Sequence, residues 1–299
     1  MKLNRSTFGD WAIILFFIVM ICICLFPMMN VFSRSLSAPS ALIRGEVGLF
    51  PLMPRADGQG FRIGVNFDAF RVVWSDPKYP FALAWTVVLT TICTAISLVL
   101  TVLCAFPFVY KELKGRKTIN FLLIFTMYFG AGAIPTFLWF RTLGLIDNPW
   151  VLILPGSLSI FLFILMRSFF YGIPDSIRES AEIDGAGPIR VLTQIYLPLS
   201  KPSLATIALF YAVGRWNSFG DALLFLRRNL EWSPIQLLLY NIQQGIQAVD
   251  GHLDGGMQVG IGEQIRTATI VIATVPILLV YPFLQKYFVA GVTLGAIKE

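Results

Sequence analysis

The chain has almost none of the side chains from which zinc sites are built. Its 299 residues include one histidine, His252, and four cysteines. Cys22, Cys24, Cys93 and Cys104 all lie inside apolar runs, and no two of them form a CxxC pair. A zinc site needs about four His or Cys ligands at suitable spacing. We therefore predict no metal site and interpret the cysteines as small buried hydrophobic residues.

Charge is also scarce, at 13% of residues against 56% hydrophobic residues, and the mean hydropathy is +0.73. Soluble domains carry about 25% charged residues, so an ordinary soluble fold is excluded. Several apolar runs reach the roughly 20 residues that a helix needs to cross a bilayer. Because the runs are continuous rather than alternating, they exclude a membrane β-barrel. The sequence predicts an all-α polytopic membrane protein.

We expect one transmembrane domain over residues 1–299. Its predicted spans cover residues 11–31, 80–110, 119–141, 150–171, 202–225 and 267–289, with outer loops at 32–79 and 226–266 and a polar segment at 172–201. The first run is longer than the apolar part of a signal peptide, about 7–15 residues, so it is expected to be a retained helix. The outer loops are too irregular in sequence for elements to be assigned.

Basic residues orient the predicted spans. Lys111, Lys114, Arg116 and Lys117 crowd one short turn, and such clusters belong on the cytoplasmic face. Both termini are then cytoplasmic. The formal net charge of +6 follows from basic residues of this kind beside spans, so we predict no nucleic-acid binding. Gly130, Gly132 and Pro135 fall inside the third span and predict a kink there.

The polar segment between the fourth and fifth spans is predicted to be a helix, a sharp bend and a second helix. Asp175 or Ser176 can cap a first helix that runs to Asp184. Gly185 follows where a left-handed residue is needed, and Pro188 suits the first turn of the next helix.

One apolar stripe is predicted on the second helix, before prolines that end it. Ile189, Leu192, Ile195 and Tyr196 recur at helical spacing, and Pro198 and Pro202 stop the helix and start the next span. Such a stripe flanked by charges suits a groove on another protein. An interfacial or re-entrant hairpin without a partner is the alternative.

The stretch ESAEIDGAGPIRVLTQIYLPLSKP, residues 179–202, resembles the EAA loop of membrane subunits of bacterial binding-protein-dependent ABC importers. Ser180 stands where that pattern usually has alanine. The matching residues are Glu179, Ala181, Asp184, Gly185, Ala186, Ile195 and Pro198.

The resemblance extends over roughly the whole chain. FTMYFGAGAIPTFLWFRTLGLIDNPWVLILPG, MRSFFYGIPDSIRESAEIDGAG, FYAVGRWNSF and KYFVAGVTLGAIKE resemble the carbohydrate importer permeases of the maltose-transporter class. The likeness is greatest to the subgroup with LplC/YtcP-type and alginate- or aldouronate-type subunits.

The resemblance implies a non-catalytic permease subunit of the bacterial cytoplasmic membrane. Its implied partners are an ABC ATPase dimer, a second homologous permease, an extracytoplasmic solute-binding protein, an oligosaccharide and the lipid bilayer. Residues 179–185 would then enter a groove of the ATPase, and the tail at 291–299 is a secondary contact. The chain has no GxxxxGK[ST] phosphate-binding loop. ATP and Mg would thus be bound by the partner, with no cofactor in this chain.

A second candidate site lies about 12 residues into the fifth predicted span, near mid-membrane. Arg215 offers a fork that suits carboxylates, while Trp216 offers a stacking face and Asn217 offers donors and acceptors. We hypothesise that the three border the translocation cavity and favour acidic, uronate-type sugars. Alternatively, Arg215 pairs with backbone carbonyls or a partner helix. Tyr128 and Trp139 are further aromatic candidates for the substrate path.

Two other function classes are weaker. An ion-coupled secondary transporter, the main alternative, normally places an acidic residue in mid-membrane. The predicted spans have no central Asp or Glu, and Asp221 near an outer end comes nearest. An intramembrane enzyme would need a catalytic constellation inside the spans, which one histidine in an outer loop does not supply.

Overall fold

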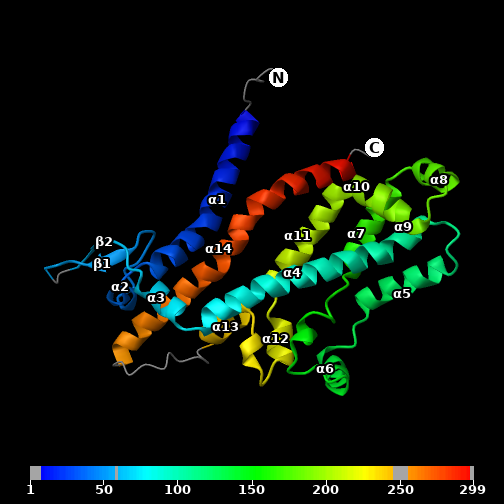
Figure 1. The fold of residues 1–299 in the computed structure, drawn as a ribbon. Coiled ribbons are helices and arrows are strands. Elements are labelled where there is room, and N and C mark those ends of the chain that lie inside the picture. The colour runs from blue at the N-terminus through cyan, green and yellow to red at the C-terminus, as the bar shows by residue number, and fades with distance from the viewer. Residues whose placement is uncertain (1–7, 58–59, 245–254, 297–299) are drawn as a thin grey trace. The chain divides into compact units, whose positions relative to one another are not determined.

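The structure, a computed structural model, describes the backbone of residues 8–57, 60–244 and 255–296 and the side chains of 9–57, 60–244 and 260–280. These residues are mostly helical (Figure 1), as predicted, but the fold is not all-α because two short strands pair at residues 52–63. Two compact units divide the chain. One comprises Met1–Pro80 and Leu239–Val275, the other Phe81–Leu238 and Pro276–Glu299.

Three helices in the described part of the chain are each long and apolar enough to cross a membrane. They are α1 (Phe8–Ser35), α4 (Lys78–Ala105, continued by the 3₁₀ turn η1 at Phe106–Val109) and α14 (Gly255–Ala296). The predicted spans 11–31, 80–110 and 267–289 correspond to them. However, α14 begins 12 residues earlier than its predicted span, so the end of the expected outer loop 226–266 is helical. The helix runs through 255–266 although four glycines lie there, and no proline interrupts this stretch.

The predicted kink in the third span is confirmed, and the bend is larger than an ordinary helix kink. Helices α5 (Arg116–Tyr128) and α6 (Ala133–Thr142) are bent by 112° at a short break. Gly132 lies in that break with φ +86°, a conformation that costs an L side chain steric energy and glycine nothing. The segment 119–141 is therefore two helices rather than one.

The fourth and fifth predicted spans are also interrupted, so single helices over 150–171 and 202–225 are wrong. The first contains a 3₁₀ turn, η2 (Pro149–Leu152), and then α7 (Ile160–Tyr171), with Pro155-Gly156 between them. The second contains α11 (Lys201–Asn217) and α12 (Gly220–Phe225). Two bent helix pairs could each count as one span, α5 with α6 and α7 with the next helix at Asp175–Ile183, and the described residues then hold up to five candidate spans. The count of six stays a prediction.

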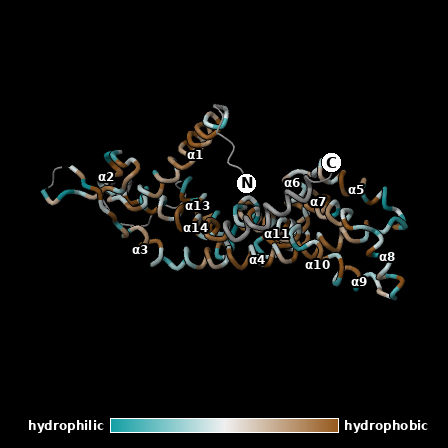
Figure 2. The backbone as a smooth tube through the Cα atoms, turned by 90° about the horizontal axis from the view of Figure 1, so that it is seen from above, coloured by the Kyte–Doolittle hydropathy of each residue, from teal (hydrophilic) through white to brown (hydrophobic). Residues whose placement is uncertain are grey.

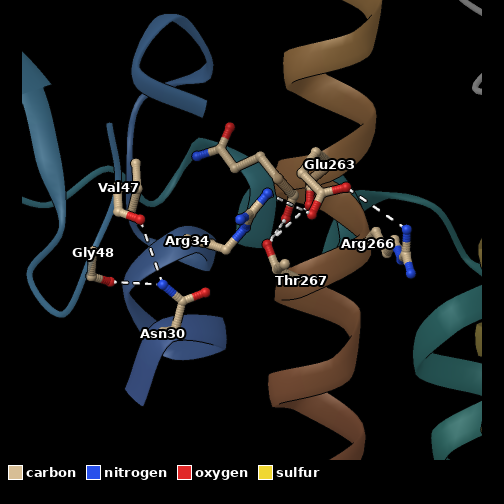
Figure 3. A network of polar contacts seen from close by, with 8 residues as sticks. Asn30, Arg34, Val47, Gly48, Glu263, Arg266 and Thr267 are labelled. Atoms are coloured by element: carbon tan, nitrogen blue, oxygen red, sulfur yellow. Dashed lines mark hydrogen bonds and ion pairs between the residues drawn. The ribbon is translucent and has the colours of Figure 1, made fainter. Parts of the chain in front are cut away.

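The first predicted outer loop, 32–79, has more structure than its sequence indicated. It contains α2 (Pro39–Ile43), an antiparallel hairpin of β1 (Leu52–Pro54) and β2 (Phe61–Ile63), and α3 (Asp68–Ser75). Asn30 of α1 holds this segment by donating to the Gly48 carbonyl at 2.9 Å (Figure 3). In the same view, Arg34 of α1 pairs with Glu263 of α14 at 3.1 Å. Such long-range contacts have no periodic signal in the sequence.

The second predicted outer loop is anchored as well. It contains the 3₁₀ turn η4 (Leu230–Trp232) and helix α13 (Ile235–Gln243). Trp85 of α4 donates its indole N–H to the Trp232 carbonyl at 2.8 Å, and the two rings are 4.9 Å apart. At the start of the same loop, the carboxylate of Asp147 accepts the backbone N–H groups of Arg227 and Arg228, each at 2.6 Å.

An aromatic core holds the second unit together. The rings of Phe106, Phe170 and Tyr196 lie 5.3–6.3 Å apart in edge-to-face contacts. Phe163 and Met166 of α7 are fully buried in the same cluster. Edge-to-face aromatic pairs add about 0.5–1.5 kcal/mol each beyond area burial. The ends of α4 and α7 and the segment after Pro188 thus form one packed block.

A close helix contact in the first unit yields a stability prediction. A Cβ on Gly260 would lie 2.6 Å from the Pro39 carbonyl oxygen and 2.8 Å from Ile43 Cγ1, whereas one on Gly262 would meet nothing within 4 Å. Overpacking costs about 1–3 kcal/mol, and alanine gains about 1 kcal/mol over glycine in a helix. We expect Gly260→Ala to lower Tm in detergent and Gly262→Ala to leave it unchanged or raise it. Equal Tm values for the two variants would contradict the α2–α14 packing.

Candidate functional site

The predicted helix after Pro174 is α8 (Asp175–Ile183), but its cap differs from the prediction. The N-cap residue is Pro174, and no side chain caps the helix, so neither Asp175 nor Ser176 has that role. The helix starts one residue early because the carboxylate of Asp175 is already engaged: it accepts a hydrogen bond from Lys111 Nζ at 2.7 Å. The same ammonium holds the pKa of Asp175 below its usual range.

The predicted bend at Gly185 is confirmed. Gly185 has φ +81°, and its N–H donates to the Glu182 carbonyl at 3.0 Å. The Ala186 N–H reaches the Ala181 carbonyl at 2.9 Å, which completes a Schellman-type C-terminal turn. Helix α9 (Pro188–Val191) then begins with a first-turn proline, as predicted. We call residues 175–191 the hairpin.

Arg178 anchors the hairpin and was missed by the sequence analysis. Its side chain is only 7% exposed and its guanidinium lies 4.9 Å from the centre of the Tyr110 ring. Nη1 is 3.4 Å from Glu182 Oε1, and Nη2 is 3.7 Å from Glu179 Oε1. The i,i+4 spacing of Arg178 and Glu182 was a usable signal, but the burial against Tyr110 was not visible in sequence.

The motif residues divide by chemistry. Ala181 and Ala186 are partly buried against the aromatic core, and so is Ile195. Glu179, Ser180, Asp184 and Pro198 are exposed. Figure 2 accordingly shows hydrophilic residues around α8, in contrast with the apolar α1. The small residues pack the hairpin against the aromatic core, and the acidic residues face outward.

The predicted apolar stripe does not face a partner. Leu192 and Tyr196 are buried in the protein's own core, whereas Ile189 is 79% exposed. The stripe rotates inward because residues 192–196 form a π-helical turn, η3 (Leu192–Tyr196). Nor do the prolines end the helix where predicted. A short α10 (Leu197–Leu199) contains Pro198, and the break comes at Ser200, with Pro202 in the first turn of α11.

Two isoleucines are left on the outer side of the hairpin. Ile183, at the end of α8, is 87% exposed, and Ile189 of α9 is nearly as accessible. Both lie within a few residues of the exposed Glu179 and Asp184. Exposed apolar side chains beside fixed charges are typical of a protein-docking surface rather than of a lipid-facing one.

The second candidate residue, Arg215, lies in a cleft of about 280 Å³ within the second unit. Its side chain is 10% exposed, and Nη1 pairs with Asp221 Oδ2 of α12 at 3.0 Å. Nε and Nη2 are buried and find no hydrogen-bond partner among the described residues. Buried guanidinium donors without acceptors are energetically costly. The remaining lining combines polar residues with apolar ones. The polar residues are Ser97, Ser159, Tyr211 and Ser218, and the apolar ones include Cys93, Leu152, Ile153 and Leu162.

The structure brings Asp221 to Arg215 rather than the predicted neighbours. The chain bends at Ser218, between α11 and α12, and this bend brings the Asp221 carboxylate back to the Arg215 guanidinium. Trp216 is buried and Asn217 donates to the Val213 carbonyl at 2.9 Å, and neither lines the cleft. Tyr128 and Trp139 are exposed on α5 and α6. The substrate-path role of these four residues stays a prediction.

Two predictions concern parts of the chain with little or no described structure. The backbone of α14 continues to Ala296, and residues 297–299 of the predicted tail contact lie outside the described residues, as does His252. Within the described residues, no group of three or more His, Cys, Asp or Glu could hold a metal ion.

The hairpin geometry predicts opposite outcomes for two neighbouring glycines. A residue other than glycine at φ +81° costs about 1–2 kcal/mol, and a Cβ added at either Gly185 or Gly187 would meet no atom within 4 Å. We therefore expect Gly185→Ala to lower Tm through the backbone alone and Gly187→Ala, at φ −72°, to leave it unchanged. A neutral Gly185→Ala variant would show that the turn is not left-handed.

The ion pair between Lys111 and Asp175 predicts a pH-dependent stability difference. Because the pKa of Asp175 is lowered on folding, its contribution is present above the usual aspartate value of about 3.9 and is lost as pH falls through the lower folded value. We expect Asp175→Asn to lower Tm at about pH 6–7 and to match wild type in acid. Asp184→Asn is the control and should show no such trend, since Asp184 is exposed and forms no ion pair with a described residue.

Comparisons with known proteins agree with this geometry. Residues 81–294 match the family described as binding-protein-dependent transport system inner membrane component. The polygalacturonan/rhamnogalacturonan transport system permease protein YtcP of Bacillus subtilis (strain 168) is 38% identical over 98% of this chain and 99% of its own. Protein LplC of the same organism is 38% identical over 92% of this chain and 90% of its own.

A solved structure shows the same fold. It is a chain of a bacterial ABC transporter involved in the import of the acidic polysaccharide alginate, which superimposes with a TM-score of 0.81 at 33% identity, over 96% of this chain and 99% of that one. The ends of α4 and α7, the hairpin and the cleft at Arg215 all lie inside the matched region 81–294. The chain belongs to the family of binding-protein-dependent transport system inner membrane components.

Proposed function

We propose that this chain is the membrane-spanning, non-catalytic subunit of an ABC importer for oligosaccharides. The observation that carries the proposal is similarity over nearly the full length to a sugar permease of known class and, at TM-score 0.81, to a chain of an alginate importer. The proposed partners are an ATPase dimer, a second homologous permease and an extracytoplasmic solute-binding protein. A related alginate transporter structure contains a periplasmic protein with bound pentasaccharide.

The proposed topology has six spans with both termini in the cytoplasm of a bacterium. The basic turn at Lys111–Lys117 and the hairpin then share the cytoplasmic side, which the contact between Lys111 and Asp175 supports. Residues 172–201 form the coupling segment, and 32–79 and 226–266 face outward. In this arrangement α5 with α6, α7 with η2, and α11 with α12 each form one broken span.

The hairpin is the proposed site where ATP-driven motion enters the permease. Arg178 and Asp175 fix it to the end of α4, while Ala181 and Ala186 fix it to the aromatic core. Because both ends are held, a force on Ile183 or Ile189 is transmitted to α4, α7 and α11 rather than absorbed by the turn. Apolar anchors beside acidic residues suit a groove on the ATPase.

The ion-coupled alternative loses its best residue. Asp221, the acid nearest mid-membrane, is paired with Arg215 at 3.0 Å, so its carboxylate is already engaged by a cation of the same chain. The same pair supports an acidic cargo. Arg215 keeps two guanidinium nitrogens buried without acceptors among the described residues, and a carboxylate is the group that a guanidinium binds best. We therefore infer that uronate-type oligosaccharides contact Arg215 in transit.

The coupling role predicts a large effect of charge at Ile183. The side chain is almost fully exposed, so Ile183→Asp is expected to leave folding intact. Loss of a central apolar anchor costs about 2 kcal/mol or more in an interface. We expect substrate-stimulated ATPase activity and co-purification of the ATPase to fall about tenfold or more, and Ile183→Leu to retain both. Normal activity of the Ile183→Asp complex would exclude the hairpin as the coupling site.

The cargo inference is tested with two variants of one ion pair. If Arg215 binds substrate carboxylates, Arg215→Gln should reduce uptake of acidic oligosaccharides about tenfold or more, with neutral ones spared. Asp221→Asn leaves the cation in place and should preserve or increase acidic uptake. A purely structural pair would instead make both variants lose acidic and neutral uptake alike. Uptake is measured in proteoliposomes with the complete transporter.

A further inference from the structure

A second cleft, unrelated to the cargo, lies where α4 and η1 end and α5 begins. Its volume is about 640 Å³. It lies entirely within the second unit and includes residues of the basic turn and of α7. The lining comprises Phe108, Lys111, Leu113, Gly115, Arg116, Lys117, Thr118, Asn120, Arg167 and Tyr171. We call it the basic cleft.

Positive charge dominates the basic cleft. Four of its lining residues are basic and none is acidic. Lys111 is partly neutralised by Asp175, which lies 2.7 Å away outside the lining. Arg116, Lys117 and Arg167 form no ion pair with any described residue. Three uncompensated cations around one cavity attract an anion, and their mutual repulsion is relieved when an anion binds.

Arg167 is held rigidly at the wall of the basic cleft. Its guanidinium lies 5.5–5.8 Å from the ring centres of Phe108, Phe163 and Tyr171. Nη1 donates to Asn120 Oδ1, and Nε is buried with no hydrogen-bond partner among the described residues. Arg116 is fixed in a similar way, because it donates to the Tyr171 hydroxyl at 2.6 Å. Two arginines are thus pre-oriented, which lowers the entropic cost of binding a ligand.

The backbone adds further donors. Gly115 is the N-cap of α5, with φ +77°, and has no side chain to cap the N–H groups of the first helical turn. Those groups lie at Lys117 and Thr118, which line the cleft. Uncapped N–H groups at the start of a helix of 13 residues favour a phosphate or another oxyanion. With the arginines, they form a donor set suited to tetrahedral oxyanions.

The position of the cleft indicates the source of the oxyanion. The long apolar helix that can span the membrane ends at Val109, two residues before Lys111. The cleft therefore begins at the depth where phospholipid head groups lie. Phe108 and Leu113 add apolar wall beside the cations, which suits the start of an acyl chain. Basic pockets between spans at the cytoplasmic face bind acidic head groups.

We propose that the basic cleft is a binding site for the phosphate head group of an anionic phospholipid. The phosphate lies against Arg116, Arg167 and the first-turn N–H groups of α5, with Lys117 at the rim. Since Lys111 is shared with Asp175 of α8, the lipid site borders the anchor of the hairpin. The proposal is independent of the transported sugar and would hold if the cargo inference failed.

The experiment uses the intact chain in detergent, with any subunits that co-purify. Phosphatidylglycerol is titrated and its binding followed by native mass spectrometry, with phosphatidylcholine and inorganic phosphate as parallel arms. Each cation near a surface adds to the attraction for acidic lipid, so we expect Lys117→Gln to weaken phosphatidylglycerol binding about fivefold and Arg116→Gln with Lys117→Gln about 25-fold. Phosphatidylcholine should bind more weakly than phosphatidylglycerol and should not respond to either variant.

Matched controls decide the outcome. Lys114→Gln removes the same charge from the same turn but outside the cleft, and it should bind phosphatidylglycerol as wild type does. Tyr171→Phe removes the hydroxyl acceptor of Arg116 without changing charge, and it should lose less binding than the double variant. Equal losses in Lys114→Gln and Lys117→Gln would reduce the effect to general surface attraction and overturn the site. Binding of inorganic phosphate but not of phosphatidylglycerol would overturn the lipid as its source.

Discussion

The buried guanidinium of Arg178 is the contact on which the arrangement of the packed block around the hairpin depends. It lies over the Tyr110 ring and between the carboxylates of Glu179 and Glu182. An arginine with 7% of its side chain exposed is stable only when its charge is matched and its plane is stacked. Because α8 supplies the acids and the residue directly after η1 supplies the ring, the cation joins segments that lie far apart in the sequence.

That contact also supports the proposed coupling role of the hairpin. A helix pair tied only by its turn would pivot about Gly185. Here the first turn of α8 is held through Asp175 and Lys111, and its last turn is held through Ala181 and Ala186. The exposed Ile183 and Ile189 are therefore attached to a packed block that holds them in fixed positions. Glu179 has two roles. Its carboxylate neutralises the charge of the buried Arg178, and its side chain is also exposed on the outer surface of the hairpin.

The two candidate ligand sites share one physical feature, an arginine whose donors exceed its acceptors among the described residues. Arg215 satisfies Nη1 through Asp221 and leaves Nε and Nη2 without partners there. Arg167 satisfies Nη1 through Asn120 and leaves Nε without one. Buried donors of this kind are energetically costly and favour an anionic ligand that supplies the missing acceptors. In the proposed topology the two sites differ in depth, because the cleft at Arg215 lies within the spans and the basic cleft lies at the end of a span.

Local rules in the sequence determined much of this protein. Hydropathy determined the mostly helical membrane fold, and the backbone demands of Gly185 and Pro188 determined the helix–turn–helix, because these effects act within a few residues. Only the tertiary structure decided which side of each helix is buried. It turned Leu192 and Tyr196 inward, brought Asp221 back to Arg215 and placed Arg178 over Tyr110. Helix breaks and π-turns shift the phase of the helix. A prediction from helical periodicity therefore assigns the wrong buried face to the residues that follow each of them.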